Sequence, residues 1–511
     1  MAAPTALEQL VLEYINDARI DPLGNAARYM SGYGAIATSG DAAINNALRF
    51  FGVSGPALQQ AYAALVPTNP VAWSDQLSNA ALLHNAAMIS SDTQTHQAPG
   101  EPDLGVRLTS AGYNFSTAGE NVFAFASSAL FGHAGFMVDW GQGPDGMQSP
   151  AGHRISIMNP AFREVGIAVT LETNSATQVG PQVVTHDFAT RQGSTAPMIV
   201  GVAYADTDGD DFYSVGEGRA GLSVSAGNAS TLGFDTGGYT LQTSAGTQTV
   251  TYSGAGLAGP VSVTLNLSAG TNVKIDFVGG VELKTSASAT VSGAITNLEI
   301  IGAVGRSLTA SGSNARNMSG ASGNDSLQGG SGANYIRGNG GNDSITGGTG
   351  FDDINGNMGN DTARGGDFDD WVVGGKDNDS LSGDAGGDLV YGNLGDDTCD
   401  GGDGNDIIRG GQDNDVVRGG AGADYVSGDR GNDTVSGGLG ADLFHSFGDA
   451  GIDRVLDFSA AEGDRVLLDL GTTFTTAQAG ADTVVSMTGG GQVVLVGVQL
   501  STLQPGWIFV G

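Results

Sequence analysis

The sequence predicts a multidomain protein that is α+β in its N-terminal part and all-β in the remainder, ending in a parallel β-roll. Three observations support this prediction. The chain has 511 residues, more than a single hydrophobic core usually organises. Apolar residues at helical spacing are concentrated near the N-terminus, and strand-like runs follow them. From Gly320 onwards a pattern of nine residues returns without a change of register, which is the mark of a solenoid.

The composition is strongly acidic. Lys and Arg contribute 20 residues and Asp and Glu 54, for a formal net charge of −34. Such a charge disfavours nucleic acid and anionic membranes as partners and favours divalent cations. The single cysteine excludes a disulfide framework. No apolar run approaches the ~18 residues of a membrane span, and the first residues lack the basic and apolar regions of a Sec signal peptide.

One position of the repeat carries an acid. It is occupied fourteen times, thirteen times by Asp and once by Asn334, always nine residues apart. A glycine stands five residues before each of these positions, and an apolar residue, or Ala363 or Cys399, stands two residues after it. The acids are Asp325, Asp343, Asp352, Asp361, Asp370, Asp379, Asp388, Asp397, Asp406, Asp415, Asp424, Asp433 and Asp442.

This spacing predicts how the acids stack. The glycines permit turns with positive φ, and the residues after each acid form a short strand whose middle side chain points inward. If two nonapeptides make one turn, acids 18 residues apart stack on one edge at the strand spacing of ~4.8 Å. Carboxylates so close repel unless Ca²⁺ lies between them, which allows at most six bridges per edge. We expect Asn334 to weaken the first site of its edge and Cys399 to be a packing residue.

Residues 320–446 resemble the RTX (haemolysin-type) repeat Gly-Gly-x-Gly-x-Asp-x-apolar-x. The resemblance implies a calcium-binding protein that the type I secretion machinery of a Gram-negative bacterium exports through an uncleaved C-terminal signal. We therefore expect a secreted or cell-surface protein. Residues 281–319 are interpreted as a degenerate start of the solenoid, and residues 447–511 as a β-cap that contains the secretion signal. Phe368, Asp377 and Asp413 replace a glycine of the pattern, which puts the local loop geometry in doubt.

The N-terminal part begins with a capping box, Thr5-x-x-Glu8, and helices are expected at about 75–91 and 127–140. Strand-like runs follow at 164–171 and 182–188. Several segments resemble the CAP (SCP/TAPS) superfamily, and they are Leu12–Arg19, Ala72–Leu77, Gly112-Tyr113, Gly119-Glu-Asn121, Ser149–Arg154 and Asn159–Gly166. The resemblance implies an α–β–α sandwich with a shallow cleft, and we assign residues 1–191 to this CAP domain.

In many CAP proteins two histidines and two glutamates line the cleft and can hold Zn²⁺ or Mg²⁺. Carried over by motif, the histidines are His96 and His153, and the first acid is Glu120. The second glutamate has no counterpart, although Asp139 or Asp145 could replace it. These residues are candidates for a metal site or for catalysis; alternatively, they stabilise the cleft through hydrogen bonds. His84, on the apolar face of its helix, is interpreted as a core histidine.

Residues 192–280 are expected to form a small β-sandwich. Its Asp-rich loop places Asp206, Asp208, Asp210 and Glu217 at positions 1, 3, 5 and 12, which is the ligand spacing of calcium loops. The flanking segments are strand-like, so the loop does not belong to an EF-hand. Calcium binding is favoured over a set of plain surface acids.

Three functions remain open. The first is a secreted calcium-binding protein whose CAP head binds a small amphiphile, a peptide or an envelope component. The second is a metal-dependent hydrolase, a protease or esterase, that uses His96, Glu120 and His153. The third is a structural or adhesive cell-surface protein. No serine lies in a nucleophile-elbow pattern, and binding is preferred.

Overall fold

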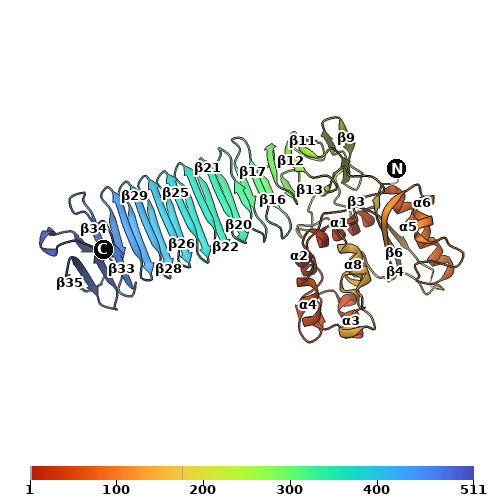
Figure 1. Cartoon of the computed structure of the whole chain (residues 1–511), viewed down its shortest axis with the longest axis horizontal. Helices are drawn as coiled ribbons and strands as arrows, with labels where there is room; N and C mark the ends of the chain where they lie inside the picture. The colour runs from red at the N-terminus through yellow and green to blue at the C-terminus, as the bar shows by residue number, and fades with distance from the viewer. Residues whose placement is uncertain (1–2, 175) are drawn as a thin grey trace. The chain divides into compact units, whose positions relative to one another are not determined.

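The computed structural model describes residues 3–174 and 176–511 (Figure 1). The chain forms two compact units. The first extends to Ser288 and includes Gly293–Ile295 and Ile301–Ala303, and the second contains Ala289–Ser292, Thr296–Ile300 and Val304–Gly511. Within the described residues, no helix is both long enough and apolar enough to cross a membrane.

The N-terminal domain is a sheet with helices on both faces. The sheet has the order β3 (Ala72–Trp73), β5 (Glu164–Leu171), β6 (Gln182–Arg191), β4 (Phe115–Ala126). One apolar core joins it to the helices α1 (Ala6–Ile20), α2 (Pro22–Ala27), α3 (Ala42–Phe51), α4 (Gly55–Ala63), α7 (Ala129–Ala134) and α8 (Gly152–Met158). Smaller clusters join its other face to α5 (Asp75–Ser91) and α6 (Leu104–Ser110). The expected α–β–α sandwich is therefore confirmed.

Local sequence signals explain several of these elements. The capping box at Thr5 and Glu8 starts α1, and α5 has the bounds that its apolar periodicity predicted. The helix expected at 127–140 is instead α7 followed by a π-helical turn, Gly135–Asp139. Arg19 is fully buried and donates hydrogen bonds to the carbonyls of residues 69, 157, 159 and 162, so it ties α1 to distant loops.

The middle segment is a β-sandwich packed within the first unit. One sheet has the order β10 (Gly238–Gln242), β7 (Met198–Tyr204), β13 (Asn272–Val278), β14 (Glu282–Thr285). The other has the order β9 (Ala229–Leu232), β8 (Ser223–Ala226), β11 (Gly246–Ser253), β12 (Val261–Leu267). Because β14 pairs with β13, the sheet continues to Thr285, beyond the boundary expected at 280. Lys274 joins the sandwich to α1 through a buried ion pair with Glu13, 2.8 Å between Nζ and Oε2.

The second unit is a parallel solenoid with two sheets, here named by the parity of their strand labels. The even sheet contains β16 (Asn297–Ile300), β18 (Arg316–Ser319), β20 (Asn334–Gly340), β22 (Asp352–Met358), β24 (Trp371–Lys376), β26 (Leu389–Leu394), β28 (Ile407–Gln412), β30 (Tyr425–Arg430), β32 (Leu443–Ser446), β34 (Arg465–Leu468) and β38 (Ile508–Val510). The odd sheet contains β15 (Ala289–Gly293), β17 (Ser307–Ala310), β19 (Ser326–Gln328), β21 (Ser344–Thr349), β23 (Thr362–Asp367), β25 (Ser380–Ala385), β27 (Thr398–Asp403), β29 (Val416–Ala421), β31 (Thr434–Leu439) and β33 (Ile452–Val455).

The register of the roll follows the repeat. In the odd sheet Ile345 pairs with Ala363 and Ala363 with Leu381, each 18 residues further along the chain. The residue two after each ladder position is buried, from Leu327 to Phe444, and Cys399 is one of them. The predictions of two nonapeptides per turn and of a packing role for Cys399 are confirmed. The strands β15 to β18 pair in parallel with those that follow them in their sheets.

The C-terminal residues continue and close both sheets. Strand β34 pairs with β38, and β33 pairs with β37 (Gln492–Leu495). The hairpin β35 (Phe474–Ala479) and β36 (Asp482–Met487) runs antiparallel to β37. The three exceptions to the glycine pattern, Phe368, Asp377 and Asp413, have φ of 81°, 74° and 76°. They therefore keep the left-handed turn at some cost in strain.

Candidate calcium ladders and histidine site

The repeat acids form a hydrogen-bonded ladder along each edge of the roll. One carboxylate oxygen, Oδ1, accepts a hydrogen bond from the backbone N–H of the ladder residue 18 positions earlier. For example, Asp379 accepts from the N–H of Asp361 at 2.8 Å. All the acids are buried, with 4% or less of their surface exposed. The ladder thus uses one oxygen of each carboxylate and orients the other.

The second oxygen, Oδ2, has no hydrogen-bond partner in most of the ladder. Among the described residues, Oδ2 is buried and unpaired in Asp343, Asp361, Asp379, Asp397, Asp415 and Asp433 on the odd edge, and in Asp352, Asp370, Asp388, Asp406, Asp424 and Asp442 on the even edge. Asp325 differs, because its Oδ2 accepts a hydrogen bond from Ala321 N–H at 2.7 Å. In Asn334 the amide oxygen is the buried unpaired atom.

The ladder glycines leave space beside these oxygens. A Cβ on Gly374 would lie 2.2 Å from Oδ2 of Asp379 and 2.9 Å from the carbonyl oxygen of Gly392. Gly338 and Asp343 have the same relation, at 2.3 Å. The space is therefore lined by oxygens and closed to any residue with a Cβ. Carboxylate and carbonyl oxygens are the ligands that Ca²⁺ prefers, so the residues fit this ion.

Burial raises the pKa of the ladder acids. Burial, followed by the neighbouring carboxylates, raises the pKa of Asp379 to about 8, although its backbone hydrogen bond with Asp361 acts in the opposite direction. Burial likewise raises the pKa of Asp352 to about 6. A buried carboxylate with one unpaired oxygen needs either a proton or a cation at neutral pH.

Two acids outside the nine-residue period end the ladders. Asp464 accepts from the N–H of Asp442 at 3.0 Å, and its Oδ2 accepts from Ser459 N–H. On the odd edge Asp453 lies beside Asp433, and its Oδ2 accepts from Ser446 at 2.9 Å. The nine-residue period predicts neither acid, because they follow the previous acids by 22 and 20 residues. A valine two residues after each of them was the available signal.

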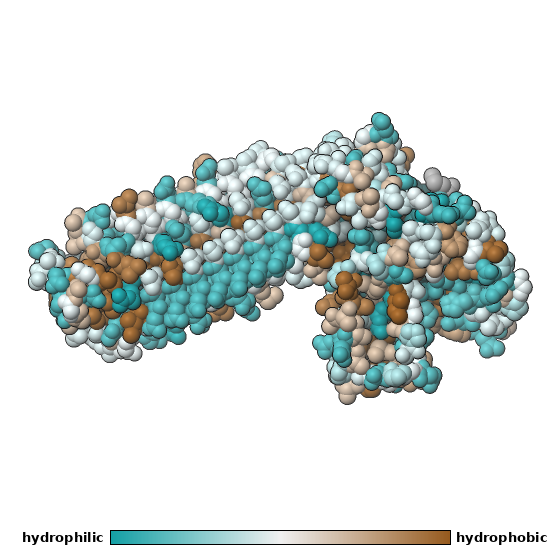
Figure 2. Space-filling view, viewed as in Figure 1, coloured by the Kyte–Doolittle hydropathy of each residue, from teal (hydrophilic) through white to brown (hydrophobic). Residues whose placement is uncertain are grey.

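A second ladder runs beside the acids on the odd edge, in the opposite direction. The side-chain oxygen of each residue accepts from the backbone N–H 18 positions later, or 20 at the last step, at 2.8 to 3.1 Å. Its members are Asn324, Asn342, Asn360, Asn378, Asp396, Asn414 and Asn432. In the space-filling view hydrophilic residues form a continuous band along the roll (Figure 2).

The acidic loop of the middle sandwich brings three of its four predicted residues together. Carboxylate oxygens of Asp206, Asp208 and Asp210 lie within 4.8 Å of one another. Glu217 is buried and closes the loop instead, because its Oε1 accepts from Thr207 N–H at 2.6 Å and its Oε2 from Ser214 N–H at 2.8 Å. The three aspartates offer the oxygen ligands of a cation site, whereas both oxygens of Glu217 are used within the loop.

The N-terminal domain contains two separate histidine–carboxylate pairs. His96 Nδ1 lies 2.9 Å from Glu120 Oε1, and the imidazole is exposed whereas the carboxylate is buried. His153 Nδ1 lies 2.8 Å from Asp139 Oδ1, and the backbone N–H of His153 donates to Oδ2. Asp139 ends the π-helical turn with φ of 57°. Of the two aspartates considered from the sequence, Asp139 rather than Asp145 is therefore the partner of His153.

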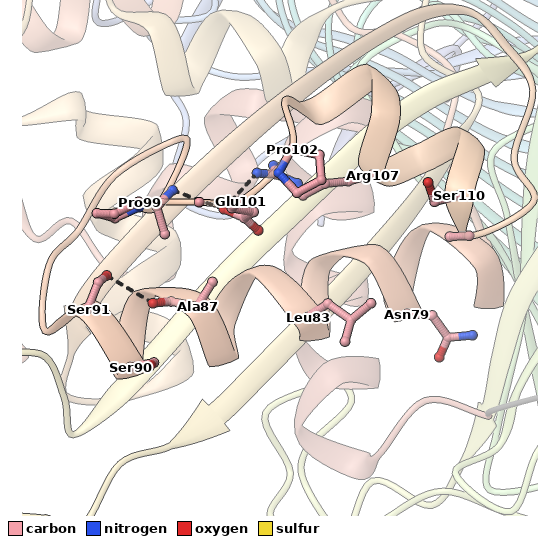
Figure 3. A pocket seen from close by; sticks show the side chains of 13 residues that line it. Asn79, Leu83, Ala87, Ser90, Ser91, Pro99, Glu101, Pro102, Arg107 and Ser110 are labelled. Carbon is pink, nitrogen blue, oxygen red and sulfur yellow. Dashed lines mark hydrogen bonds and ion pairs between the residues drawn. The ribbon is translucent and has the colours of Figure 1, made fainter.

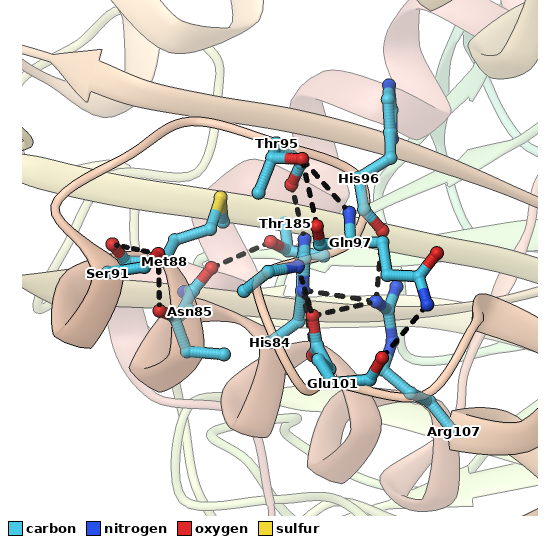
Figure 4. Close-up of polar contacts among 12 residues, drawn as sticks. His84, Asn85, Met88, Ser91, Thr95, His96, Gln97, Glu101, Arg107 and Thr185 are labelled. Carbon is cyan, nitrogen blue, oxygen red and sulfur yellow. Dashed lines mark hydrogen bonds and ion pairs between the residues drawn. The ribbon is translucent and has the colours of Figure 1, made fainter.

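A buried charge network supports Glu120. Arg107 forms ion pairs with Glu120 and with Glu101, and His84 Nδ1 lies 2.8 Å from Glu101 Oε2 (Figure 4). Burial acts to raise the pKa of Glu120, but the hydrogen bond from His96 and the nearby positive charges lower it overall. Burial and the charge of Glu120 raise the pKa of Asp187, which pairs with Glu120 across β4 and β6. His84 is a satisfied core histidine, as predicted.

The structure does not join the predicted residues into one metal cluster. In the part of the chain that it describes, the group of three acids in the middle sandwich is the one set of His, Cys, Asp and Glu ligands within 4.8 Å. His96 and Glu120 are together, whereas His153 contacts Asp139. Sequence reasoning missed Arg107, Glu101 and Asp187, because contacts that are not periodic leave no pattern in the chain.

Two depressions lie near these residues. A small pocket of about 180 Å³ is lined by His153 and the aromatic residues Phe51, Phe123, Phe125, Phe136 and Trp140. A larger open groove of about 820 Å³ lies between α5 and the segment 98–111 (Figure 3). Leu83 and Ala87 line its floor, and Glu101 and Arg107 line its wall. The buried charge network thus lies behind an accessible groove.

The fold and its ladders define a protein with an α–β–α N-terminal domain and a C-terminal roll built around rows of calcium-type ligands. Comparison with protein families identifies both parts. The model of the CAP, or cysteine-rich secretory protein, family matches residues 12–187. The model of the RTX calcium-binding nonapeptide repeat matches 319–354, 355–390, 373–408 and 409–444. The chain therefore carries a CAP domain followed by RTX calcium-binding repeats.

Two solved structures are similar over part of the chain. One is an extracellular protein containing an SCP domain from Bacillus anthracis str. Ames, with 23% identity over 24% of this chain and 35% of that chain, and a TM-score of 0.20. The other is the extracellular lipase LipA from Serratia marcescens, with 18% identity over 37% of this chain and 40% of that chain, and a TM-score of 0.16. The chain thus matches less than half the length of either protein. A comparison with curated proteins gave no match.

Proposed function

We propose that this protein acts outside the cell, where its roll folds around calcium and its CAP domain binds a small amphiphile. The groove along α5 is the observation that supports binding of an amphiphile by the CAP domain. It combines about 820 Å³ of open volume with apolar side chains such as Leu83, which is 69% exposed. Small-molecule sites are concave and mostly apolar, with a few polar groups that set the orientation.

The lining of the groove suggests how such a ligand lies. Leu83 and Ala87 offer an apolar surface for its hydrocarbon part, and Asn79, Ser90 and Ser110 offer hydrogen bonds to its polar end (Figure 3). Arg107 is engaged by Glu101 and Glu120, so its charge is already balanced and an anionic head group is not required. A neutral or zwitterionic lipid or an apolar peptide fits this lining.

Fluorescent lipid binding by the full chain in calcium tests this proposal. The probes are a pyrene-labelled fatty alcohol and a pyrene-labelled lysophosphatidylcholine. Leu83→Asp should weaken binding at least tenfold, because it places a charge on the floor of the groove. Leu82→Asp is the matched control, since Leu82 is 50% exposed on the same helix but does not line the groove. No saturable binding, or equal effects of the two changes, would contradict the proposal.

We propose that the roll folds after export, when it binds calcium outside the cell. The buried unpaired oxygens of twelve repeat aspartates support this, since they disfavour folding in a compartment with little calcium. We therefore expect type I secretion of an unfolded chain from a Gram-negative cell. EDTA should abolish the β signal of the roll in circular dichroism, and excess calcium should restore it. A spectrum that EDTA leaves unchanged would exclude a calcium-dependent roll.

A metal-dependent hydrolase is the second candidate, and the His153–Asp139 pair favours it. Asp139 accepts from Nδ1 and so holds the imidazole with its other nitrogen available, which is how a general base or a metal-binding histidine is oriented. The assay is zinc or magnesium binding together with hydrolysis of an ester and peptide panel. His96→Ala, His153→Ala and Asp139→Asn should reduce both, and Asp145→Asn should not. An absence of both metal and hydrolysis would exclude this function.

A further inference from the structure

The two sheets of the roll have chemically different outer faces. On the odd sheet the first outward residue after each ladder acid is a hydroxyl in six strands of seven: Ser326, Ser344, Thr362, Ser380, Thr398 and Thr434, with Val416 as the exception. On the even sheet the same position holds Tyr335, Asp353, Trp371, Leu389, Ile407, Tyr425 and Leu443. Since the repeat places no demand on outward residues, this difference between faces has another cause.

Aromatic rings are concentrated at one part of the even face. Trp371 is 51% exposed, and its ring centroid lies 5.6 Å from that of Phe351, which is 45% exposed. Tyr335 lies two strands away in the same sheet, and the guanidinium of Arg337 covers its ring at 3.4 Å. Arg337 is itself held by Asp353 at 2.8 Å. The rings are therefore exposed, and the Tyr335 ring is held in place.

Neither burial nor packing explains why a phenylalanine stands at position 368. It precedes Trp371 by three residues and is 65% exposed, although its φ is 81°. Eleven equivalent positions in the roll are glycine, which adopts a positive φ without strain. A bulky residue there costs stability and gains little from burial. A strained, exposed aromatic residue three residues before Trp371 in the chain indicates contact with a partner.

The same face continues into a shallow polar groove of about 570 Å³. It is lined by the amides of Asn339, Asn355, Asn357 and Asn393 and by Lys376. These residues stand at outward positions of β20 to β26, in register with the strands that carry the rings. The Asn339 amide already donates to Ser319 and Gly320, and the Asn355 oxygen accepts from Asn357 N–H at 2.9 Å, so each of these side chains keeps part of its hydrogen-bonding capacity for a ligand. The aromatic rings and the amides therefore form one surface across several turns.

We infer that this surface, the even face from β20 to β26, binds a linear, uncharged polysaccharide. Aromatic rings receive the C–H faces of sugars, and amides pair with hydroxyls that both donate and accept hydrogen bonds. Repetition at the strand spacing of about 4.8 Å suits an extended polymer better than a compact protein. The chain's net charge of −34 disfavours a polyanion. This inference gives a ligand to the third function considered from the sequence, an adhesive cell-surface protein. It rests on the proposed folding of the roll around calcium and not on lipid binding by the CAP domain.

Affinity electrophoresis and pull-down of the full chain in calcium provide the test. The probes are soluble hydroxyethylcellulose and xyloglucan, insoluble cellulose, chitin and starch, and heparin as a polyanion. Retention by at least one neutral polysaccharide is expected, with little retention by heparin. Trp371→Ala should reduce retention at least fivefold. The matched controls Thr362→Ala and Ser380→Ala, on the odd face, should leave retention unchanged.

Phe368→Gly separates binding from folding. It restores the glycine of the repeat, so the thermal midpoint in calcium should stay the same or rise, while retention falls at least threefold. Loss of retention together with a lower midpoint would contradict the inference. So would a lack of retention by every neutral polysaccharide while circular dichroism shows a folded roll. Self-association through this face, detected by sedimentation and abolished by Trp371→Ala, would assign the surface to a second copy and overturn the inference. Lipid binding at α5 is measured separately and does not depend on these outcomes.

Discussion

Asp379 offers the sharpest test of the calcium ladder. Its Oδ1 accepts the N–H of Asp361, and its Oδ2 is buried without a partner. Asp379→Ala leaves the Asp361 N–H unsatisfied, which costs about 1–3 kcal/mol. If an ion on Oδ2 is present at about a hundred times its dissociation constant, its loss costs about 2.7 kcal/mol more. The total expected loss in calcium is therefore about 4–6 kcal/mol.

Two companion variants separate these contributions. Asp379→Asn keeps an oxygen for the Asp361 N–H but removes the charge, so it should lose mainly the calcium-dependent part. Ser380→Ala changes an exposed residue on the outer face of β25 and should stay within about 0.5 kcal/mol.

The assay is urea unfolding of the full chain followed by circular dichroism, at saturating calcium and across a calcium titration. Asp379→Ala and Asp379→Asn should both raise the calcium concentration at half-maximal β signal. A change of the same size for Ser380→Ala would refute the assignment of Oδ2 as a ligand. So would an Asp379→Asn variant with the calcium response of the unmodified chain.

Three other changes test further parts of the structure. Gly374→Ala should weaken calcium-dependent folding, because its Cβ would lie 2.2 Å from the unpaired Oδ2 of Asp379. Gly340→Ala is the control, since no atom lies closer than 3.8 Å to its Cβ. Equal effects of the two changes would contradict a calcium site beside Gly374. Burial lowers the pKa of His133 to about 3, so the unfolded chain binds the proton first and stability falls as the pH drops below about 6.5. His133→Gln should thus remove about 2 kcal/mol from the difference in unfolding free energy between about pH 7 and pH 5, measured in urea, and an unchanged difference would contradict this reasoning. Lys274→Met leaves the buried carboxylates of Glu13 and Asp276 without their positive partner and should lower the free energy of unfolding in urea by about 3–5 kcal/mol. A loss below about 1 kcal/mol would show that these ion pairs do not hold the sandwich to α1.

Much of the fold could be predicted because its signals are local or periodic. The capping box and apolar spacing gave α1 and α5, and the nine-residue period gave the register of the roll. The ladder ends were missed for the same reason. Asp453 and Asp464 take ladder positions although the chain between them and the previous acids is longer than one turn. A nine-residue period cannot locate these acids, because a longer loop shifts each of them along the sequence before it reaches its position in the ladder.

The N-terminal site was predicted less completely. Motifs placed His96, Glu120 and His153, but a motif does not state which carboxylate each histidine meets. The pairing of His153 with Asp139 depends on the π-helical turn that ends at Asp139. Arg107 became part of the site only because α6 packs beside β4.

The sequence by itself determined that the protein ends in a calcium roll, because each repeat carries its own glycine, acid and apolar residue and needs no distant partner to define it. It also determined which acids stack, since the period sets the register. The tertiary structure decided how the repeat acids after Asp325 are used: one oxygen accepts a backbone N–H of the neighbouring turn, and the other has no partner and is available to a cation. It also decided that the rings of Phe351 and Trp371 meet and which carboxylates the CAP histidines contact. These depend on burial and on contacts between residues far apart in the chain, and no local pattern encodes them.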